Sequence, residues 1–183
     1  LVSTFRAVKR NCESVCSQLA LLSNDAETYY DVRYAFNSSP ETSPGEKAAQ
    51  FIYLNKCGFN GLYRVNRSGA INVAYGKRAG APHRDYATVE YCSKVLQAAQ
   101  VMNTDYQEVV SLARKGDFVY MDPPYHKEFD RSFVGYNSSP FTEEDHERLA
   151  LECKFLDNRG VLFALSNSDT DFIRNLYKNY NIY

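Results

Sequence analysis

Hydrophobic side chains recur at every third or fourth position from Val2 to Leu22. This spacing places them on one face of an α-helix and predicts a helix that packs against a core. A second helical pattern follows from about Asp25 to Phe36. The chain is therefore expected to begin with two amphipathic helices.

The middle of the chain changes from loop to helix to extended patterns. Residues 37–45 contain two prolines and no periodicity, which predicts a loop, and a short helix is expected over 46–55. Residues 56–84 contain five glycines and short apolar–polar alternations such as 70–75, a pattern typical of a hairpin with extended loops. Another helix is expected over 86–100.

Two compact apolar runs in the last part of the chain, 118–121 and 161–165, predict buried, parallel strands. A helix is expected before, between and after them, and each has a polar residue at its start that can cap free N–H groups. Asp105 and Thr142 begin two of these helices, and Asp169 or Thr170 begins the third. This order predicts an α/β fold with helices packed on a mostly parallel sheet.

The composition is that of a globular protein without membrane spans, and its net charge conceals a basic segment. A hydrophobic share of 44% with 23% charged residues is ordinary for a globular chain of 183 residues. No run approaches the roughly 18 apolar residues that a membrane span needs. The 21 Lys and Arg nearly balance the 22 Asp and Glu, giving a net charge of −1, which at first argues against nucleic acid.

The near-zero total averages two oppositely charged parts of the chain. Between Glu46 and Asp85 there is no acidic residue, while aromatic and asparagine side chains are frequent. Lys and Arg neutralise phosphates, Asn and Arg can contact base edges, and aromatic rings can insert between bases. A solvated basic surface is the alternative interpretation. The basic residues of this segment are Lys47, Lys56, Arg64, Arg67, Lys77, Arg78 and Arg84.

Five cysteines occur without a CxxC pair, so the sequence predicts free thiols in a reducing compartment rather than a zinc site. The chain begins without Met and stops at Tyr183 within a helical and aromatic pattern. We therefore expect it to be an internal piece of a longer protein.

Asp122-Pro123-Pro124-Tyr125 directly follows the first predicted strand. In an open α/β sheet, ligands bind beyond the carboxyl ends of the strands. The prolines make a stiff corner with free carbonyls, Asp122 adds a carboxylate, and Tyr125 adds an aromatic face. These groups could accept both hydrogens of an exocyclic amine and localise its lone pair for attack on a methyl group. A base paired in a duplex would first have to be flipped out and stacked on Tyr125. An ordinary turn at the end of a strand is the alternative.

These motifs resemble those of the Dam-type, α-class N6-adenine DNA methyltransferases. The resemblance is carried by the catalytic tetrapeptide Asp122–Tyr125, by Tyr53–Asn66 continued by Gly69–Gly76, and by Leu165–Thr170, within residues 46–177. It implies a Rossmann-like methyltransferase sheet, of which this chain holds part, and S-adenosylmethionine as the methyl donor. It also implies a helical and β-hairpin region for target recognition, and an adenine within GATC as the target.

The resemblance also implies roles for single residues. Asp122, Pro123, Pro124 and Tyr125 would be catalytic, and Asp122 would also contact the cofactor. Leu62 and Arg64 would contact bases, Arg64 at guanine O6 and N7, and Phe59 would insert into the duplex. The phosphates or the frame of the hairpin would be contacted by Asn60, Asn66, Asn72 and Lys77. Ala74 stands where the family usually has Pro, and Arg78 stands where an aromatic residue often follows the basic one, so Arg78 is a further candidate contact.

The family also predicts how the chain is divided. Residues 1–36 would be a helical part of the catalytic domain and the start of the insert, 37–99 the target-recognition insert, and 100–183 the C-terminal part of the catalytic core. The family's glycine-rich cofactor loop and ribose-binding acid would precede Leu1. The chain alone is therefore expected to be inactive. Residues 127–139 are expected to form a loop that closes over the site, and His126 to be a polar loop residue rather than a general base.

Other functions stay open at this point. The same corner could methylate cytosine N4, an adenine in RNA or a protein glutamine, although Asp122 and the segment 58–66 favour adenine in DNA. A catalytically dead DNA-binding relic is a further alternative. The expected partner is double-stranded DNA, with no membrane, in a bacterial cytoplasm at the nucleoid, from a bacterial or phage gene. A cognate restriction endonuclease is a further possible partner, and the sequence does not predict an oligomeric state.

Overall fold

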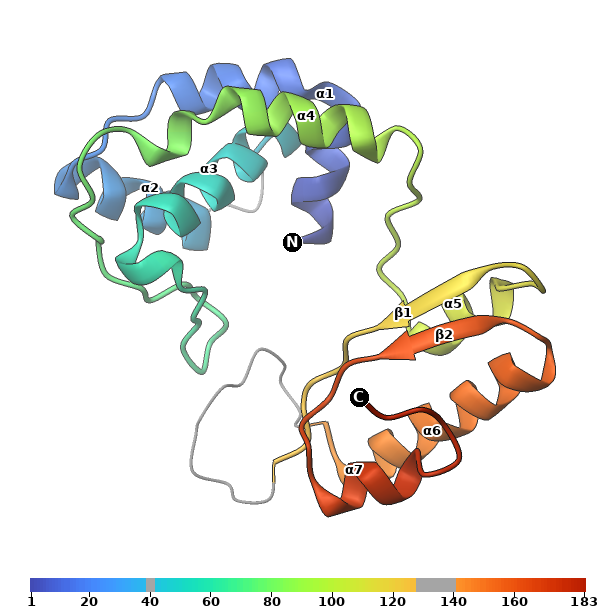
Figure 1. Cartoon of the computed structure of the whole chain (residues 1–183). Helices are drawn as coiled ribbons and strands as arrows, with labels where there is room; N and C mark the ends of the chain where they lie inside the picture. Colours follow the sequence, from blue (N-terminus) through green and yellow to red (C-terminus); the bar gives the residue numbers. More distant parts are fainter. Residues whose placement is uncertain (39–41, 128–140) are drawn as a thin grey trace. The chain divides into compact units, whose positions relative to one another are not determined.

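The computed structural model describes residues 1–38, 42–127 and 141–183, which form two compact units (Figure 1). The first unit spans Leu1–Asn103 and the second Thr104–Tyr183. Each unit has its own cluster of buried hydrophobic side chains.

The first unit is helical apart from one extended segment. Helix α3 packs on α1 and on α2, and α4 lies beside α1 (Figure 1). Ser43 caps the start of α3, because its hydroxyl accepts the Glu46 N–H at 3.2 Å. The elements are α1 Val2–Ala20, α2 Ala26–Ser38, α3 Pro44–Cys57, α4 Tyr86–Leu96, and the 3₁₀ turns Phe59–Gly61 and Pro82–Arg84.

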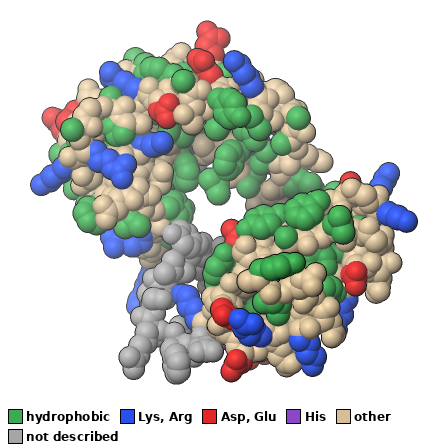
Figure 2. Space-filling view, viewed as in Figure 1, with side chains coloured by type: hydrophobic (Ala, Val, Ile, Leu, Met, Phe, Trp, Pro, Cys, Tyr) green, Lys and Arg blue, Asp and Glu red, His purple; other side chains and the backbone are tan. Residues whose placement is uncertain are grey.

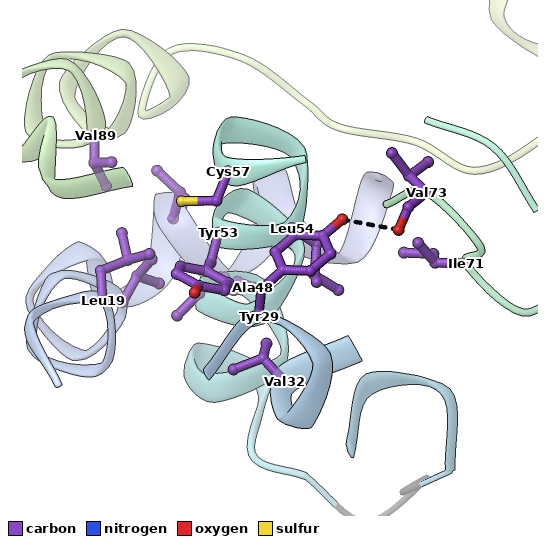
Figure 3. Close-up of a cluster of buried hydrophobic side chains, with 14 residues drawn as sticks. Leu19, Tyr29, Val32, Ala48, Tyr53, Leu54, Cys57, Ile71, Val73 and Val89 are labelled. Carbon is purple, nitrogen blue, oxygen red and sulfur yellow. Dashed lines mark hydrogen bonds between the residues drawn. The ribbon is translucent and has the colours of Figure 1, made fainter. Parts of the chain in front are cut away.

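Two fully buried tyrosines lie at the centre of this unit, between α1, α2 and α3 (Figure 3). The rings of Tyr29 and Tyr53 are 6.1 Å apart, and each hydroxyl donates to a backbone carbonyl. Tyr29 bonds to Val73 at 3.2 Å and Tyr53 to Ser23 at 2.7 Å. Burial raises the pKa of both phenols, so they stay neutral and donate. The carbonyl of Val73 belongs to the extended segment, which the core thereby holds.

The predicted helix 86–100 ends at Leu96, four residues early. The residues that follow bind α1 instead: Gln97 donates to the Lys9 carbonyl at 2.8 Å, and Lys9 donates to the Ala99 carbonyl at 2.7 Å. The Lys9 carbonyl lies beside a kink, because Asn11 has non-helical dihedrals of φ −156° and ψ 76°. The backbone continues after α4 in a tighter turn, in which the N–H groups of residues 97–99 each donate to the carbonyl three positions earlier, and these contacts with α1 hold that turn.

The second unit contains two parallel strands, β1 Phe118–Met121 and β2 Leu162–Leu165, paired from Phe118 with Leu162 to Met121 with Leu165. Its helices are α5 Tyr106–Leu112, α6 Glu143–Asn158 and α7 Asp171–Leu176. The predicted caps are confirmed, with Asp105 on α5, Thr142 on α6 and Thr170 rather than Asp169 on α7. The result is a mixed α/β arrangement with a small parallel sheet.

The prediction that both strands are buried is wrong within the described residues. Val119 and Met121 face the core with α5, α6 and α7, whereas Phe118, Tyr120 and Leu162 are between 61% and 71% exposed. Figure 2 shows hydrophobic side chains gathered over β1 and β2. The helices of the described residues pack on one face of the sheet, which leaves the alternating side chains of the other face exposed in this part of the chain.

The predicted loop 37–45 is shorter than expected. Helix α2 continues through Asn37 to Ser38, and α3 begins at Pro44, a residue that suits the first turn of a helix. The predicted strand starting at residue 161 begins at Leu162. None of the helices described is both long enough and apolar enough to cross a membrane.

Candidate functional site

The tetrapeptide Asp122–Tyr125 leaves the carboxyl end of β1, the edge of the sheet where ligands bind in α/β proteins. The Ser166 N–H, directly after β2, donates to the Met121 carbonyl at 3.0 Å, so the pairing of the two segments reaches the residue just before the corner. The side chains of Asp122 and Pro124 are exposed, Pro123 is half-buried, and Tyr125 is 48% exposed. A carboxylate and an aromatic ring are thus available to a ligand at this edge.

The residues after β2 also hold the other end of the corner. The Asn167 side-chain oxygen accepts the backbone N–H of His126 at 2.9 Å and that of Ser168 at 2.9 Å. The His126 ring bonds through Nδ1 to the Thr170 hydroxyl at 2.9 Å. His126 is therefore a residue that fixes the corner. The sequence predicted Thr170 as a helix cap and marked the segment of Asn167, but it did not predict the bonds of these two residues with His126.

Aromatic rings surround these polar groups. Phe172 lies 4.7 Å from the His126 ring, and Phe141 lies 4.7 Å edge-on from His146. His146 is 1% exposed. Its burial is the main cause that lowers its pKa, and the nearby His126 ring lowers it further. A neutral His146 can accept at Nδ1, which faces the Asn167 amide nitrogen at 3.5 Å.

In the first unit, the extended segment 58–76 forms the predicted hairpin, pinned by isolated bridges rather than by long strands. Gly58 pairs with Tyr75 and Val65 with Ile71, both antiparallel. At the base, the Gly76 N–H donates to the Cys57 carbonyl at 2.8 Å. A side chain at Gly76 would put its Cβ 2.5 Å from the Gly58 carbonyl oxygen, so glycine allows this close approach.

Helix α2 holds the second arm of the hairpin. Asn37 makes two bonds with the backbone of Ile71, donating to its carbonyl at 3.0 Å and accepting its N–H at 2.9 Å. Arg33 donates to the Val73 carbonyl at 2.8 Å, the same oxygen that Tyr29 binds. Ile71 and Val73 are buried, so their neighbours in the sequence face outward. Sequence reasoning missed Arg33 and Asn37, because no local pattern links a residue of α2 to one 34 positions later.

All eight residues predicted to contact DNA lie on this hairpin or directly after it, and all eight are exposed. Phe59 and Leu62 are large apolar side chains that are 52% and 46% exposed. Asn60 and Lys77 have positive φ values of 52° and 53°, at the two turns that lead into and out of the hairpin. The eight are Phe59, Asn60, Leu62, Arg64, Asn66, Asn72, Lys77 and Arg78.

Two of these residues, Arg64 and Asn66, also hold the hairpin itself together through side-chain hydrogen bonds. Arg64 donates through Nε to the Asn72 side-chain oxygen at 2.8 Å and through a terminal nitrogen to the Asn72 carbonyl at 3.2 Å. Asn66 caps the turn at the tip, where its side-chain oxygen accepts the N–H groups of Ser68 and Ala70, each at 3.0 Å. Arg64 is therefore held in one direction at the surface, and Asn66 shapes the turn.

Six of the seven basic residues of this run divide into two groups in the structure, and Lys56, which is half-buried at the end of α3, belongs to neither. Lys47 donates to the Phe36 carbonyl at 2.5 Å, and burial lowers the pKa of its amine. Arg84 donates to the Leu22 carbonyl at 2.8 Å. These two cations serve the fold of the first unit. The group exposed on and after the hairpin consists of Arg64, Arg67, Lys77 and Arg78.

The predicted site residues thus form two groups, one in each compact unit. Asp122–Tyr125 belong to the second unit and the eight hairpin residues to the first. Of the predicted closing loop 127–139, only Lys127 lies within the described residues. The five cysteines are free thiols, and burial raises the pKa of Cys57 and of Cys153 to about 11.

Comparison with known proteins identifies the family. The model of the D12 class N6 adenine-specific DNA methyltransferases matches residues 1–183. The chain is 34% identical to the retron Ec67 DNA adenine methylase of Escherichia coli, over 98% of this chain and 62% of that protein. It is 34% identical to the type II methyltransferase M.MjaIII of Methanocaldococcus jannaschii, over 100% of this chain and 67% of that protein.

The DNA adenine methylase of Escherichia coli K12 is 33% identical over 97% of this chain and 65% of that protein. The chain thus spans about two thirds of the length of these relatives, 62% in the first case. The chain belongs to the D12 class of N6 adenine-specific DNA methyltransferases.

Proposed function

We propose that the full-length gene product containing this chain transfers a methyl group to N6 of an adenine in double-stranded DNA, at GATC. The observation that carries the proposal is the corner Asp122–Tyr125, which leaves the carboxyl end of a parallel strand with its carboxylate and ring exposed. Membership of a family of adenine-specific DNA methyltransferases supports the choice of reaction.

The chemistry requires that a weak nucleophile be made stronger. The lone pair of an exocyclic amine is delocalised into the ring, and two acceptors at the amine hydrogens draw the nitrogen towards tetrahedral geometry. The Asp122 carboxylate and the Pro123 carbonyl are the two acceptors in this proposal. Tyr125 would stack on a flipped base and keep its amine beside them. Positioning and electrostatic stabilisation are enough, so no general base is required before transfer.

S-adenosylmethionine is the proposed methyl donor, and it supplies an electrophilic methyl group when bound. The residues of the corner fit this chemistry. The exposed Asp122 carboxylate can accept an amine hydrogen, and its negative charge favours a positive charge near the transferred methyl group. Asp122 is the residue of this chain that would hold the cofactor. We place it in a Rossmann-like methyltransferase sheet to which β1 and β2 belong.

Target recognition is assigned to residues 37–99, with 1–36 as the helical part of the catalytic domain that leads into it and 100–183 as the C-terminal catalytic core. The exposed hairpin cations neutralise phosphates, Arg64 and Leu62 read bases, and Phe59 enters the duplex. Asn60, Asn72, Lys77 and Arg78 supply further contacts, while Asn66 maintains the turn. The names of two relatives as type II methyltransferases support pairing with a restriction endonuclease.

The test is methyl transfer from labelled S-adenosylmethionine by the full-length gene product. The substrates are a duplex with one GATC site and a matched duplex in which the site is scrambled, and the products are digested to nucleosides for mass spectrometry. We expect N6-methyladenine from the GATC duplex only. N4-methylcytosine, or label in RNA or protein alone, would replace the proposed substrate, and no label in any acceptor would favour a DNA-binding relic.

A further inference from the structure

The corner Asp122–Tyr125 is stiff at its prolines, but among the described residues it has no backbone hydrogen bonds of its own that hold it in place at the end of β1. Pro123 and Pro124 have no backbone N–H, and none of the four residues makes a backbone hydrogen bond within the part of the chain that is described. Proline restricts its own φ, and each of the two prolines restricts the ψ of the residue before it, but ψ of Pro124 and both dihedrals of Tyr125 are left to be set by other groups. The geometry of the two acceptors therefore depends on contacts made at the two ends of the corner.

Consecutive residues after β2 make both of these contacts. The Ser166 N–H donates to the Met121 carbonyl at 3.0 Å, just before the corner. The Asn167 side-chain oxygen accepts the His126 N–H at 2.9 Å, just after it. A hydrogen bond of 2.6 Å between the Tyr120 and Ser166 hydroxyls adds a side-chain link at the first end.

The Asn167 side chain is itself held in one orientation. Its oxygen accepts two N–H groups, from His126 and Ser168, which only the oxygen of the amide can do. Its nitrogen faces Nδ1 of His146, which is kept neutral by burial and can accept. The two ends of the amide thus have different partners, so a rotated amide would lose all three contacts.

The His126 side chain reinforces the same end. Its side chain is 10% exposed, its ring packs on Phe172, and its Nδ1 is 2.9 Å from the Thr170 hydroxyl. That hydroxyl oxygen already accepts the Ile173 N–H at 3.3 Å, so its proton is free to be donated to the ring. The residue that follows Tyr125 is therefore tied to the start of α7 as well as to Asn167.

We propose that Asn167 is a positioning residue for methyl transfer: its side-chain oxygen fixes the carboxyl end of Asp122–Tyr125, so that the Asp122 carboxylate and the Pro123 carbonyl converge on the target amine. The proposal rests on the proposed function of the corner. Asn167 acts through the His126 N–H and needs no contact with substrate.

The test compares three variants of the full-length gene product. Asn167→Ala removes the acceptor, Asn167→Asp keeps an oxygen that can accept both N–H groups, and Asn175→Ala is the control. Asn175 is exposed on α7, and its side-chain oxygen accepts a hydrogen bond from the Lys178 amine at 3.3 Å. The measurements are kcat and KM for a GATC duplex, and hydrogen exchange of the His126 amide.

We expect Asn167→Ala to lower kcat on the order of 10- to 100-fold, the effect of a small misplacement of reacting groups, with KM for DNA within about twofold. Asn167→Asp should retain most of the activity and the slow exchange of the His126 amide, and Asn175→Ala should equal the wild type. A merely structural residue would lower the folded fraction without this division between kcat and KM and without rescue by Asp.

Three results would overturn the proposal: an unchanged kcat in Asn167→Ala, an equal loss in Asn167→Asp and Asn167→Ala, or a fast-exchanging His126 amide in the wild type. If Asn167→Ala does not fold, the Asp variant and the wild-type exchange rate still decide. Asp122→Ala separates the two levels of inference. If it leaves methyl transfer intact, the function proposed for the corner is wrong, whereas loss in Asp122→Ala with full activity in Asn167→Ala refutes the positioning role alone.

Discussion

Replacing Arg64 by alanine should relax the preference for guanine in the recognition site. In the structure, Nε and one terminal nitrogen of Arg64 are committed to Asn72, at 2.8 Å and 3.2 Å. A guanidinium has five N–H donors in a fixed plane, so three remain for a base. Two of these suffice for the bidentate contact to guanine O6 and N7.

The magnitude follows from that contact. A bidentate pair of this kind discriminates between bases by about 1–3 kcal/mol. At roughly 1.4 kcal/mol for each factor of ten, its loss should reduce the ratio of specific to altered-site affinity by about 5- to 150-fold. Asn72→Ala keeps the arginine but frees it to move. Ordering one such side chain costs about 0.5–1.5 kcal/mol, so specific binding should weaken by only about 2- to 10-fold.

The assay is fluorescence anisotropy of two labelled duplexes, one with GATC and one with the guanine replaced, at a single fixed salt concentration. Arg67→Ala is the matched control, because Arg67 is an exposed arginine at the tip of the same hairpin. A cation that meets only phosphate affects both duplexes equally. If Arg64→Ala also weakens both duplexes by the same factor, Arg64 does not read a base and the assignment is refuted.

Three further predictions concern stability, each measured by urea unfolding of the protein. Burial lowers the pKa of His83 and of His146 below 6.5, so the unfolded state binds more protons and stability should fall as the pH drops below 6.5. The double variant His83→Gln with His146→Gln should flatten that decline, and an unchanged slope would contradict the prediction. Leu156 is fully buried, so Leu156→Ala should lower the free energy of unfolding by about 2–5 kcal/mol. Leu151 is exposed on the same helix, so Leu151→Ala should change it by no more than about 0.5 kcal/mol, and equal effects would argue against the described core. Thr142→Ala removes the hydroxyl that accepts the Asp145 N–H in a capping box and should cost about 0.5–2 kcal/mol, and no loss would mean that this cap is dispensable.

Local signals in the sequence predicted the elements well where the cause is local. Thr142 and Asp145 cap each other across three residues, and the alternation of the buried Ile71 and Val73 with the exposed Asn72 and Ala74 follows from the pleat of an extended chain. The corner Asp122–Tyr125 was predicted at the carboxyl end of a strand, and the structure places it there.

The contacts that were missed join residues far apart in the sequence. Asn37 binds Ile71 across 34 positions, and Asn167 binds His126 across 41. Asn37 is not marked by any motif, and the segment Leu165–Thr170 marks Asn167 as part of a family motif without indicating which residue it binds. The contact of Gln97 with the Lys9 carbonyl is of the same kind, because it joins residues 88 positions apart.

Exposure of the strands could not be read from composition either. Phe118, Tyr120 and Leu162 have the apolar character of buried strand residues, but the described helices cover only the opposite face. Burial depends on what packs on a strand, which a run of four apolar residues does not specify.

The most direct test of the proposed chemistry is the rate of a single turnover of the full-length gene product with Asp122→Ala, measured together with its affinity for a GATC duplex. Asp122 is exposed, so the substitution should not disturb folding, and Asp157→Ala, which removes another exposed carboxylate of the same unit, is the control. Removing one preorganised electrostatic contact should slow methyl transfer on the order of 10²- to 10³-fold. We predict this loss with duplex affinity unchanged, and a wild-type rate in Asp122→Ala would contradict the assignment of catalysis to this corner.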